Sequence, residues 1–266
     1  EERSARASRQ IGRDSLLGFA MHVYPGFKIG PHHRKLAKIF QDVIAGKKKR
    51  VIINIAPRMG KSEFSSYLFP AYFMGHFPDK KIIMGTHTAS LSEDFGRRVK
   101  NLVDSEEYQE LFPETTLAAD QKASGKWSTG AGGQYYAAGV GGALAGRGAD
   151  LFVIDDPHSE QDVKANSKAA FDSAWKWFQT GPLQRLMPDG AIIVIMTRWG
   201  KLDLTGRLIE YQIKNPESDP WEIVELPAIL HEGTENEKSL WPEQWSLEAL
   251  KSKKAERVFL LGDNTN

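Results

Sequence analysis

The feature that most constrains the fold of this chain is a β-branched apolar run that leads directly into Gly-Lys-Ser and then into a helical pattern. The run is Val51-Ile52-Ile53-Asn54-Ile55, and the motif is Gly60-Lys61-Ser62. Phosphate-cradling loops lie between a strand and a helix in this way. The alternative is an ordinary strand-turn-helix connection with a surface lysine. We favour the phosphate-binding loop, or P-loop, because both flanking patterns are present.

The residue types of this loop suit a nucleoside triphosphate. Loop amides and a helix N-terminus direct partial positive charge at phosphate oxygens, and glycine lets the backbone approach them closely. Lys61 is expected to reach the β and γ phosphates, and the Ser62 hydroxyl to ligate Mg²⁺. The pattern departs from GxxxxGK[ST] because Ile55 occupies the position of its first glycine. The nucleotide-binding candidates here are Pro57, Arg58, Met59, Gly60, Lys61, Ser62 and Glu63.

A second apolar run, Leu151-Phe152-Val153-Ile154, ends in Asp155-Asp156. Such a buried strand places a carboxylate beside the P-loop serine, where it holds Mg²⁺ directly or through water. We assign that role to Asp155, and we expect Asp156 to orient or deprotonate an attacking water. The alternative is a pair of acids that merely cap a strand.

A third run, Ile192 to Met196, is followed by Thr197, Arg198 and Trp199. Ligands of open α/β sheets bind at the carboxyl ends of the strands. Thr197 or Arg198 is therefore a candidate sensor of the γ-phosphate. The alternative, which the residues leave open, is a structural ion pair for Arg198 and a core position for Trp199.

The remaining pattern predicts strands that alternate with helices, and hence a mainly parallel α/β sheet with helices on both faces. Pro70 is expected to kink or end the helix after the P-loop. Ser90 and Glu93 match a capping box. A boundary is expected near Gly200. The predicted helices are 32–45, 62–74, 90–103, 165–178, 202–213 and 246–254, and the further strands are 81–85 and 221–226, with extended segments in 126–140.

Length and composition limit the alternatives. The 266 residues suit one large domain with a small lid. The chain has no cysteine, which excludes a disulfide framework and thiolate metal sites, and its histidines lack HExxH spacing. No stretch has membrane-spanning length. The net charge is only +1, so we expect weak DNA contact by an isolated copy; the basic clusters at 47–50 and 97–100 are either DNA contacts or solvated faces.

Several short segments in order resemble one known family. The chain is similar to the ATPase region of large terminase subunits, the motors that package DNA into the capsids of tailed phages. The segments run across most of the chain, and the ordered set is more specific than any member. They are Ala56-Pro57-Arg58-Met59-Gly60-Lys61-Ser62-Glu63, Phe69-Pro70-Ala71-Tyr72, Ser90-Leu91-Ser92-Glu93-Asp94-Phe95-Gly96-Arg97, Gly146-Arg147-Gly148, Ile154-Asp155-Asp156-Pro157, Thr197-Arg198-Trp199 with Asp203-Leu204, and Leu240-Trp241-Pro242-Glu243.

The resemblance implies a RecA-like fold of the ASCE class of P-loop NTPases, and further residue roles. Arg58 would contact the γ-phosphate of its own subunit. Arg147, in a glycine-rich loop, would be an arginine finger for a neighbouring subunit's ATP or else a plain loop arginine. Thr197 and Arg198 would belong to the motif that couples hydrolysis to movement. Many terminases have Asp-Glu where this chain has Asp155-Asp156, so the base is Asp156, which we favour, or Glu160.

By the same resemblance the cofactors would be ATP and Mg²⁺, and residues upstream of the P-loop would hold adenine. The candidates there are Tyr24, Phe27, His33 and Gln41. We expect an ATPase domain over residues 1–266, with a core at about 31–200, a lid from 1–30 and 201–266, and no nuclease domain or nuclease activity.

The implied partners are double-stranded DNA, a portal protein and a small terminase subunit. The expected assembly is a homo-oligomeric ring, a pentamer by resemblance, with a monomer in isolation, in the host cell cytoplasm and without a membrane. The competing interpretations are a helicase-like protein and a regulatory nucleotide-binding P-loop module.

Overall fold

A seven-stranded sheet forms the centre of the computed structural model, which describes residues 2–119, 123–144, 146–164 and 167–261. The strand order is β3-β4-β2-β5-β6-β1-β7. All neighbours are parallel except β3, which is antiparallel to β4. The strands are β1 (Arg50–Ile55), β2 (Lys81–Thr86), β3 (Lys126–Ser128), β4 (Gln134–Gly139), β5 (Ala149–Asp155), β6 (Leu186–Met196) and β7 (Glu222–Leu226), and a separate pair is formed by β8 (Ile229–Leu230) and β9 (Lys238–Ser239).

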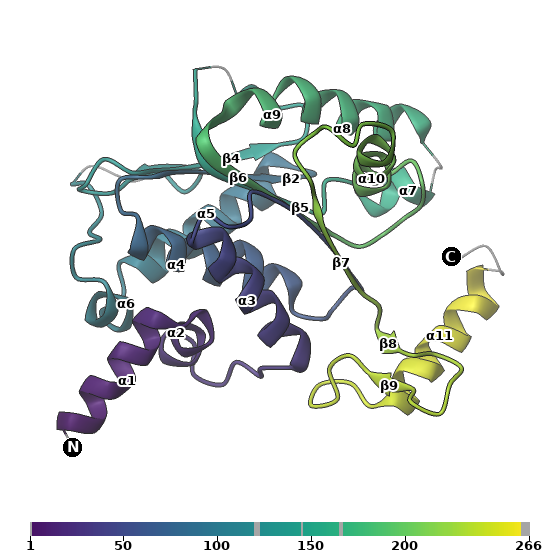
Figure 1. Cartoon of the computed structure of the whole chain (residues 1–266), viewed down its shortest axis with the longest axis horizontal. Coiled ribbons are helices and arrows are strands. Elements are labelled where there is room, and N and C mark those ends of the chain that lie inside the picture. Colours follow the sequence, from purple (N-terminus) through teal and green to yellow (C-terminus); the bar gives the residue numbers. More distant parts are fainter. Residues whose placement is uncertain (1, 120–122, 145, 165–166, 262–266) are drawn as a thin grey trace.

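Helices cover both faces of this sheet, so the predicted fold class is confirmed (Figure 1). Helices α7 to α10 lie on one face, and α3, α4 and α5 on the other. The helices are α1 (Glu2–Asp14), α2 (Leu16–Val23), α3 (Pro31–Ile44), the π-helix η1 (Glu63–Leu68), α4 (Phe69–His76), α5 (Ala89–Val103), α6 (Glu106–Leu111), α7 (Glu160–Lys164), α8 (Lys168–Thr180), α9 (Pro182–Arg185), α10 (Leu204–Lys214) and α11 (Leu247–Leu261).

The central strands have apolar residues on both faces because both faces are buried. In β1, Val51 and Ile53 pack with the helices of one layer, and Ile52 between them packs with the other layer. Alternate side chains of a strand point to opposite faces, so a continuous apolar run supplies two cores at once. Within the described residues, no helix is long and apolar enough to cross a bilayer.

The helix after the P-loop does not end at Pro70. It continues to His76, and the turn before Pro70 is a π-helix in which the Phe69 amide donates to the Phe64 carbonyl, five residues back. Proline lacks an N–H and clashes with the carbonyl four residues earlier. The wider π turn accommodates both defects without breaking the helix.

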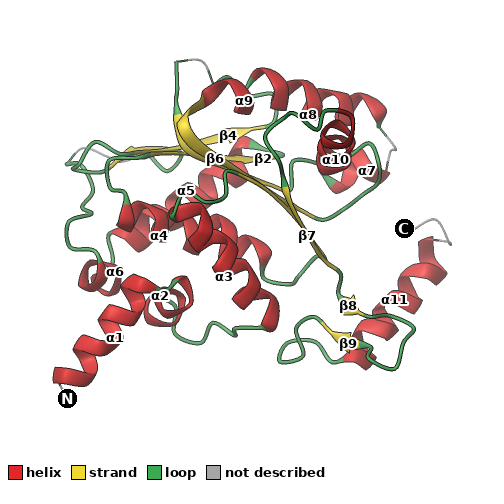
Figure 2. Ribbon diagram, viewed as in Figure 1, coloured by secondary structure: helices red, strands yellow, loops and turns green. Residues whose placement is uncertain are grey.

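Two other expectations require correction. The N-cap of α5 is Thr88, whose side chain accepts from the Leu91 amide, so Ser90 lies inside the helix. The boundary near Gly200 is wrong for the sheet, because β7 pairs with β1 and belongs to the core. Helices α1 and α2 lie beside α6, away from α11 (Figure 2), so among the described residues only the end of the N-terminal segment, at Lys28 and Gly30, lies against the C-terminal residues Gln244 and Trp241. Residues 165–166 of a predicted helix lie outside the described residues, and α8 begins at Lys168.

Candidate nucleotide site

The loop after β1 has the backbone geometry of a tight cradle. Arg58 has φ of 59° and Gly60 has φ of 73°. Gly60 also has no room for a side chain, because a Cβ there would lie 2.8 Å from His33 Nε2. Arg58 is not glycine, and a left-handed conformation of a non-glycine residue marks local strain of the kind found at ligand sites.

Two side chains from distant segments hold this loop from behind. His32 Nε2 lies 2.8 Å from the Met59 carbonyl oxygen, and Trp245 Nε1 donates to the Arg58 carbonyl at 3.2 Å. Burial, with a contribution from His32, lowers the pKa of His33 to about 3, so His33 is neutral near pH 7. The loop therefore rests on a neutral, aromatic support that includes Trp241.

Lys61 and Asp156 meet at the centre of the site. Lys61 Nζ lies 2.6 Å from Asp156 Oδ2, and the Thr197 amide donates to Asp156 Oδ1 at 3.0 Å. Asp156 has φ of 42°. One strand, β6, separates the strands that carry the two residues, and its end supplies Thr197. The structure thus brings together Lys61, Asp156 and Thr197, which lie far apart in the sequence.

Asp155 is buried next to this pair, with 2% of its surface exposed. The Ser66 hydroxyl donates to its Oδ2 at 2.8 Å, whereas its Oδ1 has no hydrogen-bond partner among the described residues. Burial, reinforced by the nearby Asp156 carboxylate, raises the pKa of Asp155 to about 6, although Lys61, Ser62 and Ser66 oppose the shift. A buried carboxylate oxygen without a donor is costly, and a bound cation would satisfy it.

This donor set fits Mg²⁺. The ion prefers one or two carboxylates, with nucleotide phosphates and water completing its shell. Asp155 Oδ1 supplies a free carboxylate oxygen, and Ser62 lies close enough to affect the pKa of the same carboxyl.

Arg198 is held in ion pairs. Its Nε lies 3.1 Å from Asp203 Oδ2, and its NH1 lies 3.8 Å from Glu225 Oε1. Asn54 at the end of β1 donates to the same Glu225 oxygen at 2.7 Å. Arg198 therefore links the end of β6 to β7 and to the N-terminus of α10, where Asp203 is the cap. A role as sensor would require it to leave these partners.

The other P-loop candidates are distributed around this centre. Pro57 and Arg58 are exposed, and Met59 is buried. Glu63 pairs with Arg98 at 2.6 Å, and Arg98 lies over the Tyr67 ring.

The structure brings three of the adenine candidates together, because the Phe27 ring contacts both the Tyr24 and the His33 rings, and it leaves Gln41 apart. His33 is fully buried beneath Gly60, and Tyr24 is 38% exposed and packs against Phe27 and Tyr67. Gln41 donates to the Asp14 carbonyl at the end of α1. Eight residues of α-helix, about 12 Å, separate it from His33.

Arg147 lies outside the centre. Arg147 precedes β5, whereas Asp155 ends it, and the strand between them, Ala149–Asp155, is about 20 Å long at about 3.3 Å per residue. Its guanidinium lies 3.7 Å from the centroid of the Tyr136 ring. Glu160 is exposed in the first turn of α7.

Sequence reasoning missed the residues that support the site. His32, Ser66 and Trp245 act on the loop or on Asp155, and Asn54, Asp203 and Glu225 position Arg198. Asn54 carried a signal, because a polar residue interrupts an otherwise apolar strand. Asp203 belongs to a segment that resembles the family and lies only five residues from Arg198. The remaining residues gave no signal, because their partners come from remote segments.

Comparisons with known proteins identify a family and similar folds. The sequence model described as "Terminase large subunit, T4likevirus-type, N-terminal" matches residues 52–265. No curated protein matches the chain.

Two solved structures share the fold. The large terminase of bacteriophage HK97 is 17% identical with a TM-score of 0.50, and the match covers 87% of this chain and 48% of that one. A variant of the large terminase ATPase domain of Thermus phage P74-26 is 15% identical with a TM-score of 0.53, and the match covers 90% and 91%. The chain thus spans about half the length of the HK97 protein.

Proposed function

The chain belongs to the terminase large subunit family of T4-like-virus type, in its N-terminal region, and from this premise we propose that it is the ATP-hydrolysing motor domain of a DNA-packaging terminase. The observation that carries the proposal is the convergence of Lys61, Asp155 and Asp156 at the carboxyl edge of a parallel sheet. This edge is where ligands bind in open α/β folds.

ATP binding would exchange the partner of Lys61. The P-loop amides and Lys61 would take the β and γ phosphates, and Lys61 would then release Asp156 Oδ2. The carboxylate would stay oriented, because the Thr197 amide holds its other oxygen. Freed in this way, Asp156 would accept a hydrogen bond from a water in line with the γ-phosphate. Glu160 is the alternative base.

Asp155 and Ser62 would hold Mg²⁺. When bound, the ion would offset phosphate charge and orient the phosphates. The buried, unpartnered Oδ1 of Asp155 supports this assignment.

Arg58 would offset γ-phosphate charge within the same subunit, since it lies in the cradle itself. Arg147 would act on a neighbouring subunit. Its guanidinium lies over Tyr136 of β4, which is level with Phe152 in the middle of the sheet and not with Asp155 at the P-loop edge, and this supports a trans role. Thr197 couples the site to α10 through Arg198 and Asp203, and loss of phosphate would be transmitted along this connection.

In the whole protein, hydrolysis would drive double-stranded DNA into a procapsid. The subunits would form a ring, with a portal protein and a small terminase subunit as partners, in the cytoplasm of the host. Residues 227–261 would form the lid, because Trp241 and Trp245 already contact the P-loop and its supports.

Steady-state ATP hydrolysis as a function of protein concentration tests the proposal. We expect specific activity to rise with concentration, Lys61→Ala and Asp156→Asn to lower it at least about 100-fold, and Arg147→Ala to lower it with nucleotide binding intact. Arg34→Ala, on the exposed side of α3, is the matched control.

Nucleotide binding without turnover at any concentration would contradict the motor function and favour a regulatory P-loop module. Activity that is independent of concentration and of Arg147 would contradict only the trans finger.

A further inference from the structure

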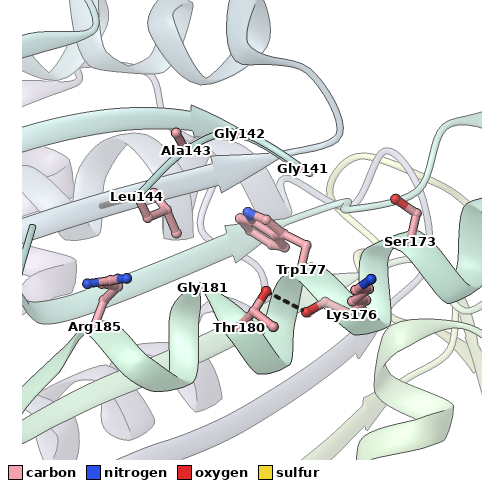
Figure 3. Close-up of a pocket in the computed structure, with 10 residues that line it drawn as sticks. All are labelled: Gly141, Gly142, Ala143, Leu144, Ser173, Lys176, Trp177, Thr180, Gly181 and Arg185. Atoms are coloured by element: carbon pink, nitrogen blue, oxygen red, sulfur yellow. Dashed lines mark hydrogen bonds between the residues drawn. The ribbon is translucent and has the colours of Figure 1, made fainter. Parts of the chain in front are cut away.

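A second polar pocket lies on the α8–α9 face of the sheet, away from the P-loop. It has a volume of about 380 Å³ and is formed by the loop after β4 and the end of α8 (Figure 3). β4 is four strands from β1, which at about 4.8 Å per strand places it about 19 Å away. The lining residues are Gly141, Gly142, Ala143, Leu144, Ser173, Lys176, Trp177, Thr180, Gly181 and Arg185.

Two hydrogen-bond donors in this pocket have no acceptor. Trp177 is only 5% exposed, and its Nε1 has no partner among the described residues; the same holds for Arg185 Nε. In Figure 3 the indole lies between the loop and α8, with its nitrogen directed away from the helix backbone. Burying an unsatisfied donor costs about 1–3 kcal/mol, so an acceptor that enters the pocket would remove that penalty.

The charge of the pocket selects an anionic acceptor. Lys176 and Arg185 are its charged residues, and no carboxylate is among the described residues that line it. The nearest acid in sequence, Asp172, is already paired with Arg207. Carbonyls at a helix C-terminus would repel an anion, but here those of Lys176 and Trp177 accept from Thr180 Oγ1 and the Gly181 amide.

We propose that this pocket binds a phosphate oxyanion, and that its source is the backbone of DNA. A phosphate group offers several acceptor oxygens, which suits a pocket lined by an indole N–H with a guanidinium at one end and an ammonium group at the other (Figure 3). Arginine and lysine side chains also contact phosphates without reading sequence, as a translocating motor requires. The phosphate chemistry stands on the pocket alone, whereas DNA as its source rests on the proposed function.

The pocket shares its loop with Arg147. Tyr136 donates to the Ala143 carbonyl at 3.4 Å, and the guanidinium of Arg147 lies over the same tyrosine ring. Gly141 and Gly146 have φ of 80° and 73°, so this segment uses backbone conformations that other residues rarely adopt. Phosphate in the pocket would therefore act on the loop that carries the proposed finger.

Indole N–H signals in a ¹⁵N NMR spectrum test the pocket directly. The chain has seven tryptophans, and Trp177→Phe identifies the signal of Trp177. We expect inorganic phosphate to shift this signal with saturation, and chloride at equal ionic strength not to do so. Arg185→Gln and Lys176→Gln should each weaken phosphate binding at least about tenfold, whereas Lys168→Gln, an exposed lysine on the same helix, should leave it unchanged.

A short DNA duplex distinguishes the two sources of phosphate. The salt dependence of DNA binding gives the number of phosphate contacts. If DNA shifts the Trp177 signal and Arg185→Gln lowers that number by about one, the source is the DNA backbone. A shift with phosphate but not with DNA supports the oxyanion pocket and overturns DNA as its source.

The proposal is overturned if neither ligand moves the signal, or if chloride moves it equally. A shift that appears only on raising the protein concentration would assign the pocket to an acidic group of a second copy and would likewise overturn it. ATP hydrolysis measured on the same samples separates the proposals, because a phosphate-dependent shift without hydrolysis leaves the pocket intact and contradicts the motor.

Discussion

Asp155 shows how one residue of this site works against the stability of the fold. Its carboxyl is buried beside a second carboxylate, and its pKa is raised to about 6. Between about pH 4 and 6 the folded state therefore binds more protons than the unfolded state, and stability from this group is lost as pH rises through that range. At pH 7 the ionised carboxylate lowers the free energy of unfolding, and a bound cation would offset this loss.

We predict that Asp155→Asn stabilises the metal-free protein at pH 7.5 by roughly 1–3 kcal/mol. The amide is neutral and still accepts from Ser66. Urea unfolding in a chelator at pH 7.5 and pH 4.5 measures the effect, and the difference from wild type should shrink at the lower pH. Asp79→Asn, on the exposed turn before β2, is the control, and equal pH dependence in all three proteins would refute the account.

The residues of the site were only partly predictable. Lys61, Asp155 and Asp156 stand in local patterns, at the ends of apolar runs, so the sequence places them at one sheet edge. Ser66 and Trp245 gave no local signal, because a hydroxyl one turn further along a helix and an indole near the chain end become relevant only through tertiary contact. The Lys61–Asp156 ion pair was also not predicted, since spacing shows proximity and not partners.

At the level of elements, the buried parallel strands were predicted from their continuous apolar runs. Their ends agree within about two residues, except that β6 begins at Leu186, well before the apolar run from Ile192. Thr88 and Ser90 are both acceptable caps for α5, and only the structure shows that Thr88 is extended and caps the Leu91 amide. The π turn before Pro70 has no periodic signature.

We predict that Thr88→Ala destabilises the protein by about 1 kcal/mol, because the first turn of α5 loses its cap. Ser90→Ala should change stability by less than about half of that, since it replaces an exposed residue inside the helix with a better helix former. Thermal or urea unfolding of the two variants measures both. A larger loss for Ser90→Ala would show that the helix begins one turn later in solution.

In the whole molecule, a segment far from the P-loop in sequence supports it. Residues from Trp241 to Trp245 join the C-terminal part to the loop and to His32 and His33. The lid expected from both chain ends stays a prediction. The partners of α1 and α2 were not predictable from their polar and short apolar patterns.

We predict that Trp245→Phe weakens ADP binding about fivefold while the fold is retained. The ring stays, but the Arg58 carbonyl loses one neutral hydrogen bond, worth about 1 kcal/mol. Calorimetric titration of ADP measures the affinity. Trp175→Phe, on α8 and against Phe178, is the control, and equal affinities in both variants would show that the C-terminal segment does not act on the loop.

The position of Arg147 at the opposite end of β5 from Asp155 has a consequence for rings that contain defective subunits. On the proposed assignment, two subunits form every hydrolytic centre: one contributes the P-loop and the other contributes the arginine. The position of a defect therefore decides which centre loses hydrolysis. Loss of Lys61 inactivates the centre of the same subunit, and loss of Arg147 inactivates the centre of the neighbouring subunit. Copies with complementary defects would, placed side by side, rebuild an intact centre between them.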